Sequence, residues 1–423
     1  MRIEDFDSGL QPIPGAVPAW QGEADATRWR ALCRRARDDG GRLLALWGSD
    51  WRASRGAFAV HVALIVRSGL VWLTHPVAGE SYPGIADLFP PADRMQRAVA
   101  DLFGIRADDP PAARPWLRHG AWPADQFPLR KDFDARAWRA NVPDAYPFVR
   151  VEGDGVHEIP VGPVHAGTIE PGHFRFSVLG ERVLRLEERL GYKHKGIEKR
   201  FEQMLLAEGA RLAARVSGDS TVAYGWAYAM AVESALGMSP PARALWLRAL
   251  LLERERIANH LGDLGFLGND AGFAFGLAQF SRLKENVLRT NAELFGHRYL
   301  MDLIVPGGVA RDLSETGAAQ IGAECDALGP AVEYLHHIYD DHAGLQDRFM
   351  SAGCVTPELA DRLGLCGLAG RASSQSWDAR AQFPPTPYGE LDVKMATQRN
   401  GDVAARVLVR FDEVVESLRL CRL

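Results

Sequence analysis

The sequence lacks the cysteine patterns of disulfide-rich and metal-thiolate proteins. Its 423 residues include five cysteines, and no two of them form a CxxC pair. A disulfide framework is typical of small secreted chains, and this chain does not have that size or that spacing. The five thiols are therefore expected to stay reduced, as in a cytoplasmic protein.

Long apolar runs are also missing. The most apolar stretch, residues 57–73, is interrupted by His61 and Arg67, whereas a membrane-spanning helix needs about 20 mostly apolar residues. The first residues do not combine a basic region with an apolar run, so we predict no secretory signal. Any association with a membrane is expected to come through partner chains.

There is no excess of positive charge and no dinucleotide-binding loop. The formal net charge is −5, which argues against a nucleic-acid-binding protein. No GxGxxG motif follows a predicted strand, so direct binding of NAD has no support. What remains is an ordinary globular composition, with 47% hydrophobic and 24% charged residues, and a length that suggests about two or three domains.

The pattern of apolar residues predicts an α+β fold with two domains, residues 1–140 and 141–423. The first is a small α+β domain with an irregular, proline- and tryptophan-rich tail, and the second is mainly helical after a small sheet. The expected helices cover about 24–39, 93–103, 219–236, 239–264, 278–300, 314–349 and 402–420. The expected strands cover 42–47, 58–66, 70–74, a strand-rich patch in 149–186, and 392–396, and residues 367–388 are expected to form a loop.

One predicted helix carries a line of polar residues through an apolar sequence. Glu253, Arg256, His260 and Asp263 follow one another at spacings of three, four and three, which places them on one helical face. Ion pairs along a solvated helix edge are common and explain such a stripe. The alternative is a stripe that faces a cavity inside a helical bundle, where redox and proton chemistry require titratable groups.

Several short motifs resemble a known superfamily. Residues 101–105 (DLFGI) and 127–133 (FPLRKDF) resemble the C-type subunit of NADH:quinone oxidoreductase. Residues 162–174 and 191–199 resemble the large subunit of energy-converting nickel–iron hydrogenases. Stretches 255–261, 307–309 and 370–373 resemble both those hydrogenases and the D-type subunit of complex I. The order is that of a C–D fusion, as in formate hydrogenlyase-type complexes.

This resemblance implies roles for eight residues. Glu170 would relay protons and His165 would carry or share them, while His260 and Arg256 belong to the polar stripe and Asp270 would lie near a quinone-binding region. Three residues would bind a cofactor in the loop that closes the cavity: Arg371, Asp378 and Arg380. The simpler interpretations stay open, since Glu170 could cap a loop and an arginine could form a structural ion pair.

The chain departs from the hydrogenase pattern where metal ligands are required. Hydrogenases of this type bind nickel and iron through two CxxC pairs, and the first pair would fall at Ser217 and Ser220. The second CxxC pair would lie near the C-terminus. Cys421 is not part of such a pair, so the sequence is expected to stop short of that segment. No metal site is therefore predicted. The quinone-binding tyrosine of complex I would fall near Gly218, so quinone is a candidate ligand without support at that position.

The resemblance therefore implies an oxidoreductase subunit that is inactive alone, without a nickel–iron site. It would handle protons and the electrons of a small iron–sulfur partner that resembles the B-type subunit of complex I. Membrane subunits that translocate ions would hold it at the cytoplasmic face, and NAD would act only through other subunits. The alternative is a non-catalytic subunit that keeps the fold for structural coupling.

Overall fold

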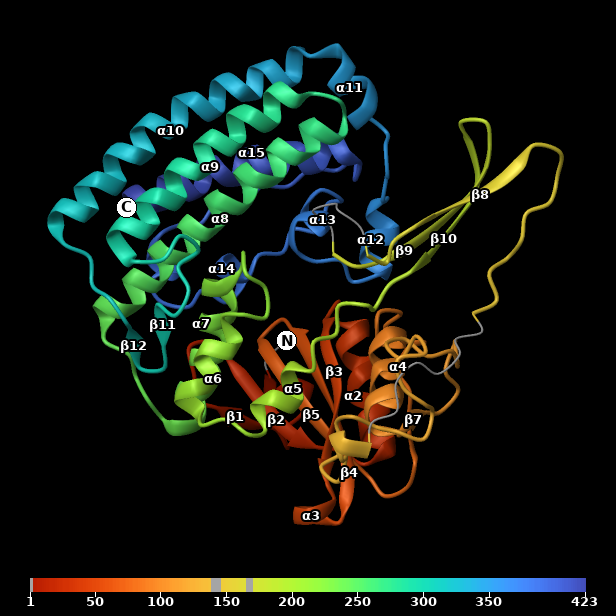
Figure 1. Ribbon diagram of the computed structural model, residues 1–423. Helices are drawn as coiled ribbons and strands as arrows, with labels where there is room; N and C mark the ends of the chain where they lie inside the picture. Colours follow the sequence, from red (N-terminus) through yellow and green to blue (C-terminus); the bar gives the residue numbers. More distant parts are fainter. Residues whose placement is uncertain (1–2, 138–145, 165–169) are drawn as a thin grey trace. The chain divides into compact units, whose positions relative to one another are not determined.

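The computed structural model describes residues 3–137, 146–164 and 170–423. The chain forms two compact units: one comprises residues 1–21, 66–71 and 204–423, and the other comprises residues 22–65 and 72–203 (Figure 1). The predicted α+β class, with a small mixed N-terminal part followed by a mainly helical part, is confirmed. The predicted domain boundary at residue 140 lies outside the described residues.

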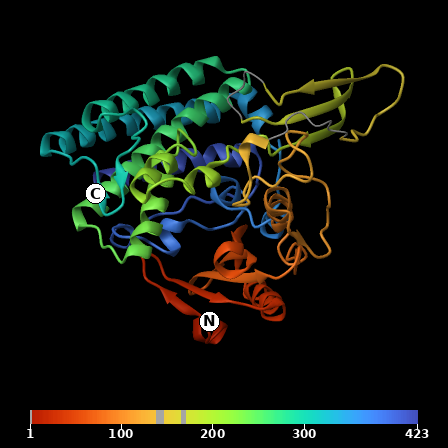
Figure 2. The same cartoon turned by 60° about the horizontal axis from the view of Figure 1, so that its bottom comes forward.

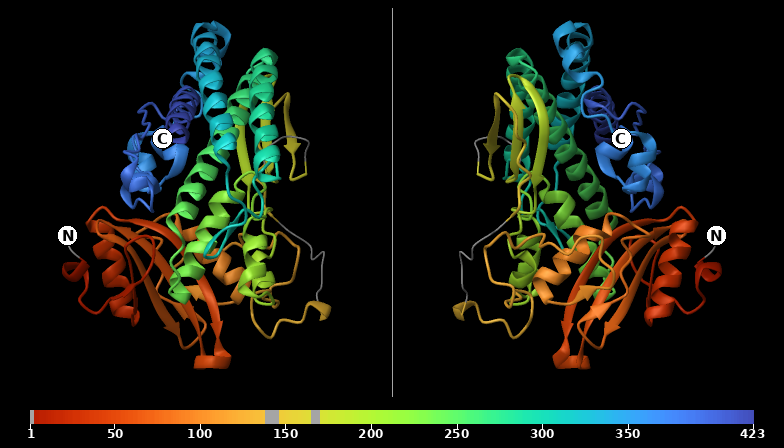
Figure 3. Two further views of the ribbon diagram at one scale, coloured as in Figure 1. Left: turned by 90° about the vertical axis from the view of Figure 1, so that its left-hand side faces the viewer. Right: turned by 90° about the vertical axis from the view of Figure 1, so that its right-hand side faces the viewer.

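Residues 22–65 and 72–203 include a long antiparallel pair of strands joined by a helical turn (Figure 3). Strands β3 and β4 pair from Arg42 opposite Ile65 to Trp51 opposite Ala57. They belong to a sheet of order β1-β2-β5-β4-β3, and α4 packs on β3. The bounds are β1 Gln11–Ile13, β2 Ala19–Glu23, α2 Ala26–Asp38, β3 Arg42–Trp51, α3 Arg52–Arg55, β4 Ala57–Val66, β5 Gly69–Val77, β6 Ser81–Tyr82, α4 Ala92–Phe103 and β7 Arg106–Ala107.

Another sheet, which lies wholly within residues 72–203, has three antiparallel strands, with β9 in the middle. Its strands are β8 Val156–Val161, β9 His173–Leu179 and β10 Arg182–Arg189, followed by helix α5 at Ile197–Phe201. The strand-rich patch predicted for 149–186 is therefore present. Most residues of β8 and β10 are exposed, because this small sheet has little to pack against within its own unit.

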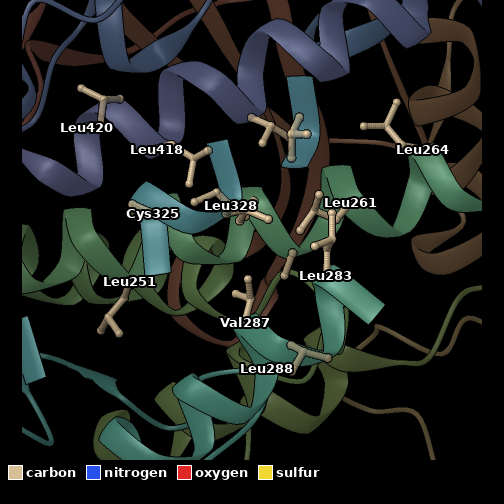
Figure 4. Close-up of a cluster of buried hydrophobic side chains, with 14 of the residues drawn as sticks. Leu251, Leu261, Leu264, Leu283, Val287, Leu288, Cys325, Leu328, Leu418 and Leu420 are labelled. Carbon is tan, nitrogen blue, oxygen red and sulfur yellow. The ribbon is translucent and has the colours of Figure 1, made fainter. Parts of the chain in front are cut away.

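The helical unit is built around α8, which packs against both α9 and α15 (Figure 2). Helix α10 in turn contacts α15, and apolar side chains from all four helices fill the space between them (Figure 4). The main helices are α6 Leu206–Ala213, α7 Thr221–Leu236, α8 Ala242–Asp270, α9 Ala274–Phe295, α10 Glu315–Asp341 and α15 Val403–Arg422. The shorter elements are α1 Ile3–Phe6, β11 Ile304–Val305, β12 Gly308–Val309, α11 Ala343–Phe349, α12 Pro357–Arg362, α13 Gly367–Arg371 and α14 Ala379–Gln382.

Three predicted segments differ from the structure. Residues 392–396 form no strand, because Asp392 has a positive φ of 48° and the backbone N–H of Lys394 donates to the Glu416 side chain. The predicted helix 314–349 is two helices, since His342 ends α10 and its ring caps α11 through the N–H of Leu345. Residues 367–388 are not wholly a loop, because the short helices α13 and α14 lie within them.

Close packing between α8, α9 and α10 predicts a sharp effect of one added methyl group. A Cβ atom at Gly268 would collide with the hydroxyl of Tyr339, which donates to the Leu264 carbonyl at 2.8 Å. Gly268→Ala is expected to lower the free energy of unfolding by about 1–3 kcal/mol. Tyr339→Phe, combined with it, should recover part of that loss because the hydroxyl is gone.

The matched control is Gly322→Ala in α10, where the added Cβ meets open space. That change should stabilise the protein by roughly 0.5–1 kcal/mol, because alanine loses less backbone entropy in a helix than glycine does. Denaturant unfolding of the four proteins measures both effects. Equal stability of Gly268→Ala and the parent protein would contradict the close contact between Gly268 and Tyr339.

Candidate functional site

The polar stripe of α8 is divided between the interior and the surface. Glu253 and His260 are buried, at 2% and 8% exposure, whereas Asp263 is exposed and pairs with Arg410 at 2.6 Å. The solvated-edge interpretation therefore holds for Asp263 only. The other members of the stripe meet charged groups from α13, α14 and α15 inside the helical unit.

Glu253 lies at the centre of a buried hydrogen-bond network. Arg380 Nη1 donates to both of its oxygens at 2.8 and 2.9 Å, Tyr388 Oη donates at 2.5 Å and Ser417 Oγ donates at 2.6 Å. Arg380 also contacts Asp378, whose Oδ2 lies 2.8 Å from Nη2. Burial and the neighbouring Glu253 carboxylate raise the pKa of Tyr388 well above its usual value, so this phenol remains protonated. The network gives Glu253 four donated bonds.

A second carboxylate, Glu413 on α15, collects three cationic or titratable partners. Arg371 Nε donates at 2.5 Å and Arg256 Nη2 at 2.7 Å. His260 Nε2 lies 2.9 Å from Glu413 Oε2. Burial opposes ionisation of Glu413, but His260 and the guanidinium charges outweigh burial and hold its pKa well below the usual range. Burial lowers the pKa of His260, which favours the neutral ring.

The two networks together are called the charged cluster. Arg256 joins them, since its Nε lies 3.6 Å from Glu253 Oε2. Three carboxylates face three guanidiniums, so the cluster is neutral when His260 is neutral. That balance matters because an unpaired buried charge is far more costly than a paired one. The members are Glu253, Arg256, His260, Arg371, Asp378, Arg380, Tyr388, Glu413 and Ser417.

A further carboxylate on α8, whose role was not predicted from the sequence, lies against the start of α7. Glu255 accepts the backbone N–H groups of Val222 and Ala223 at 2.6 and 3.0 Å. Burial raises the pKa of Glu255 to about 7, against the opposing effect of these two donors, and Asp219 adds to the rise. Its signal in the sequence is weak, because it lies off the polar stripe and follows two other charged residues.

Glu255 lies next to the turn that would carry the first cysteine pair of a hydrogenase. In that turn Ser217 Oγ donates to Asp219 Oδ1 at 2.7 Å, and Asn259 of α8 donates to the Asp219 carbonyl at 2.7 Å. Serine hydroxyls are far less acidic than thiols and are poor ligands for nickel and iron. Within the described ranges, no group of three His, Cys, Asp or Glu side chains is arranged to hold a metal ion. Ser217 and Ser220 thus present hydroxyls where the resemblance places the first pair of thiolates.

The structure brings together five of the eight site residues named from the sequence. Arg256, His260, Arg371, Asp378 and Arg380 all belong to the charged cluster. The sixth, Asp270, is exposed at the last position of α8. The seventh, Glu170, is exposed in the other unit, where it pairs with Lys193. The eighth, His165, lies outside the described residues.

Comparison with known proteins agrees with this architecture. Residues 23–138 match the respiratory-chain NADH dehydrogenase 30 kDa subunit, and residues 270–423 match the 49 kDa subunit. Formate hydrogenlyase subunit 5 of Escherichia coli is 34% identical over 391 residues, which are 90% of this chain and 69% of that protein. The chain belongs to the family of complex I and hydrogenase large subunits. The resemblance inferred from the motifs is confirmed.

Other relatives carry names that point to different reactions. The C/D subunit of the NADH-quinone oxidoreductase of Phocaeicola vulgatus is 27% identical over 89% of this chain and 76% of its own length. A solved structure of the membrane-bound sulfane sulfur reductase, an archaeal respiratory membrane complex, has a TM-score of 0.60 at 26% identity. The match covers 65% of this chain and 73% of the chain in that structure.

Among the described residues, no helix has both the length and the apolar character needed to cross a membrane.

The pKa of Glu255 predicts a pH-dependent difference between the parent protein and Glu255→Gln. A raised carboxyl pKa means that the folded state binds more protons between about pH 4.5 and 7, so this group makes the parent less stable as pH rises. When the pH is raised from 5 to 8, the free energy of unfolding of the glutamine variant should increase by roughly 2–3 kcal/mol relative to that of the parent. Chemical denaturation at both pH values measures the difference, and a pH-independent difference would contradict the assignment.

Proposed function

We propose that this chain is a core subunit of a complex I-like or hydrogenase-like oxidoreductase in which its own residues manage protons rather than a nickel–iron centre. The single observation that carries the proposal is Glu255, a buried carboxylate with a pKa of about 7, beside the serine-containing turn. A group with that pKa can both take and release a proton near neutral pH. Glu255 also lies next to the turn with Ser217 and Ser220, where the redox chemistry of the family would take place.

The charged cluster would keep this region polar and fixed in shape. Glu413 stays ionised, Tyr388 stays protonated and His260 is neutral, so the cluster presents a defined set of donors and acceptors. His260 is the second proposed member, because the Glu413 carboxylate 2.9 Å from its Nε2 favours the protonated ring, while burial lowers its pKa. Glu255 and His260 are therefore the proposed proton-handling residues.

Electrons would reach the site from an iron–sulfur cluster held by a partner protein, and membrane proteins of the complex would hold the assembly at the cytoplasmic face. Hydrogen activation at nickel is not part of the proposal, because hydroxyls stand at Ser217 and Ser220 in place of thiolates. The named relatives include a quinone reductase and a sulfane sulfur reductase. A quinone or a sulfur compound is therefore the acceptor class to test.

One observation favours the alternative, a structural coupling role. Glu253 receives four hydrogen bonds from three buried side chains, so its oxygens are saturated and it is poorly placed to exchange protons. Saturated buried networks rigidify a core without taking part in chemistry. In that case the charged cluster would only join α8, α13, α14 and α15.

Activity measurements on the purified complex distinguish the proton-handling role from the structural coupling role. Glu255→Gln and His260→Gln are each expected to slow reduction of a quinone analogue or polysulfide by roughly 100-fold, the usual effect of losing a proton-transfer group. In Glu255→Gln, the dependence of the rate on a group of pKa about 7 should also disappear. The matched control is Glu285→Gln, a partly exposed carboxylate on α9 that pairs with Arg298, and it should leave the rate unchanged.

Full activity of both variants in an intact complex would reject proton handling and leave the structural role. Asp270→Asn adds a separate test of the region named by family resemblance, since this exposed residue can be changed without disturbing the core. Elemental analysis of the same preparation should find no stoichiometric nickel. One nickel per chain would show that Ser217 and Ser220 do not prevent assembly of a metal centre.

A further inference from the structure

A pocket unrelated to the charged cluster lies in the unit of residues 22–65 and 72–203. It has a volume of about 290 Å³ and is formed by α4, the proline- and tryptophan-rich segment around residues 114–124, Tyr146 and the end of β10. Among the described residues, its lining includes four arginines, Arg97, Arg114, Arg118 and Arg189, and one carboxylate, Glu188. The chain as a whole carries a net charge of −5, so this concentration of positive charge is local.

Aromatic rings hold two of the guanidinium groups by their faces. Arg97 lies over the Trp116 ring at 5.2 Å, and Arg189 lies over the Tyr146 ring at 4.2 Å. A guanidinium stacked in this way directs its N–H groups outward along its edge, and that planar fork matches the oxygens of a phosphate or carboxylate.

A histidine in the wall orients Arg189 and adds no charge of its own. His119 Nε2 lies 3.0 Å from the Leu190 carbonyl, which requires that this nitrogen donate. Arg189 Nη2 lies 2.9 Å from Nδ1, which therefore accepts. The ring is thus neutral, and its stacking on Tyr192, with centroids 4.1 Å apart, fixes its plane.

Among the four arginines of the pocket, Arg97 gives the strongest indication of a bound anion. It is only 7% exposed, and its Nε, 3.2 Å from Asp93 Oδ2, makes no regular hydrogen bond. Burial lowers the pKa of Arg97, and the like charges of Arg114 and Arg94 add to the effect, although Asp93 and Asp101 act against it. A guanidinium remains charged under such conditions. A buried cation crowded by other cations would be stabilised by a bound anion.

We propose that this pocket binds a small polyanion of the phosphate class, held by Arg97, Arg114, Arg118 and Arg189. The volume is at the lower end of the range for small-molecule pockets, about 300–1,000 Å³. It therefore accommodates a compact phosphate compound rather than a dinucleotide. This site is separate from the proposed proton-handling residues and does not depend on that function.

Calorimetric titration of the purified protein with pyrophosphate and with inorganic phosphate tests the proposal. Both should bind, pyrophosphate more tightly because of its higher charge, and binding should weaken as ionic strength rises. In Arg114→Gln/Arg118→Gln the Kd for pyrophosphate should rise about tenfold or more, because charge-assisted hydrogen bonds are lost. Arg97→Lys, which keeps the charge but loses the fork, should also weaken binding.

The matched control is Arg106→Gln/Arg182→Gln, which removes the same charge from exposed positions outside the pocket and should leave the Kd unchanged. Unchanged thermal unfolding of each variant shows that its fold is retained. The proposal is overturned if neither phosphate compound binds, or if the control weakens binding as much as the pocket variant. Tighter binding of a hexaglutamate peptide than of pyrophosphate would also overturn it, since that result indicates docking of an acidic protein segment.

Discussion

The helical unit depends on the neutrality of its buried charges. Glu253, Asp378 and Glu413 face Arg256, Arg371 and Arg380 in a region that water hardly reaches. Each of these charges would be strongly unfavourable alone, and only the complete set makes their burial tolerable. The cluster therefore constrains the packing of α8 against α13, α14 and α15 more specifically than the apolar contacts around it, which allow small shifts.

The same constraint explains why the site is a proton-handling region in our proposal and not simply a polar core. A neutral, fully bonded framework fixes the surrounding groups, and Glu255 stands outside it with two backbone donors and a raised pKa. The guanidinium partners of Glu413 and Asp378 lower the pKa of each carboxyl, whereas Glu255 can change its protonation state near neutral pH. Different burial and different partners thus give two roles to residues only two positions apart on α8.

Much of this arrangement could be predicted from the sequence, because it follows from local patterns. The spacing of Glu253, Arg256 and His260 places them on one helical face, and the apolar run before them predicts a buried helix. The family motifs added Arg371, Asp378 and Arg380. The absence of a strand at 392–396 was not predictable, since it depends on a long-range bond from Lys394 to Glu416. The roles of Glu413, Tyr388 and Glu255 were missed for the same reason: each is defined by partners distant in the sequence.

The distance along the chain between the partners of the charged cluster also affects how the protein is made. Arg256 precedes its partner Glu413 by 157 residues, and Glu253 precedes Ser417 by 164. At a synthesis rate of about 5–20 residues per second, the ribosome needs roughly 8–30 s to add that length. During this interval α8 has emerged while its charges have no counterparts on α15, so it cannot adopt its final environment. The polar stripe of α8 can therefore meet its partners on α15 only late in synthesis, whereas the contacts between α8 and α9 can form earlier.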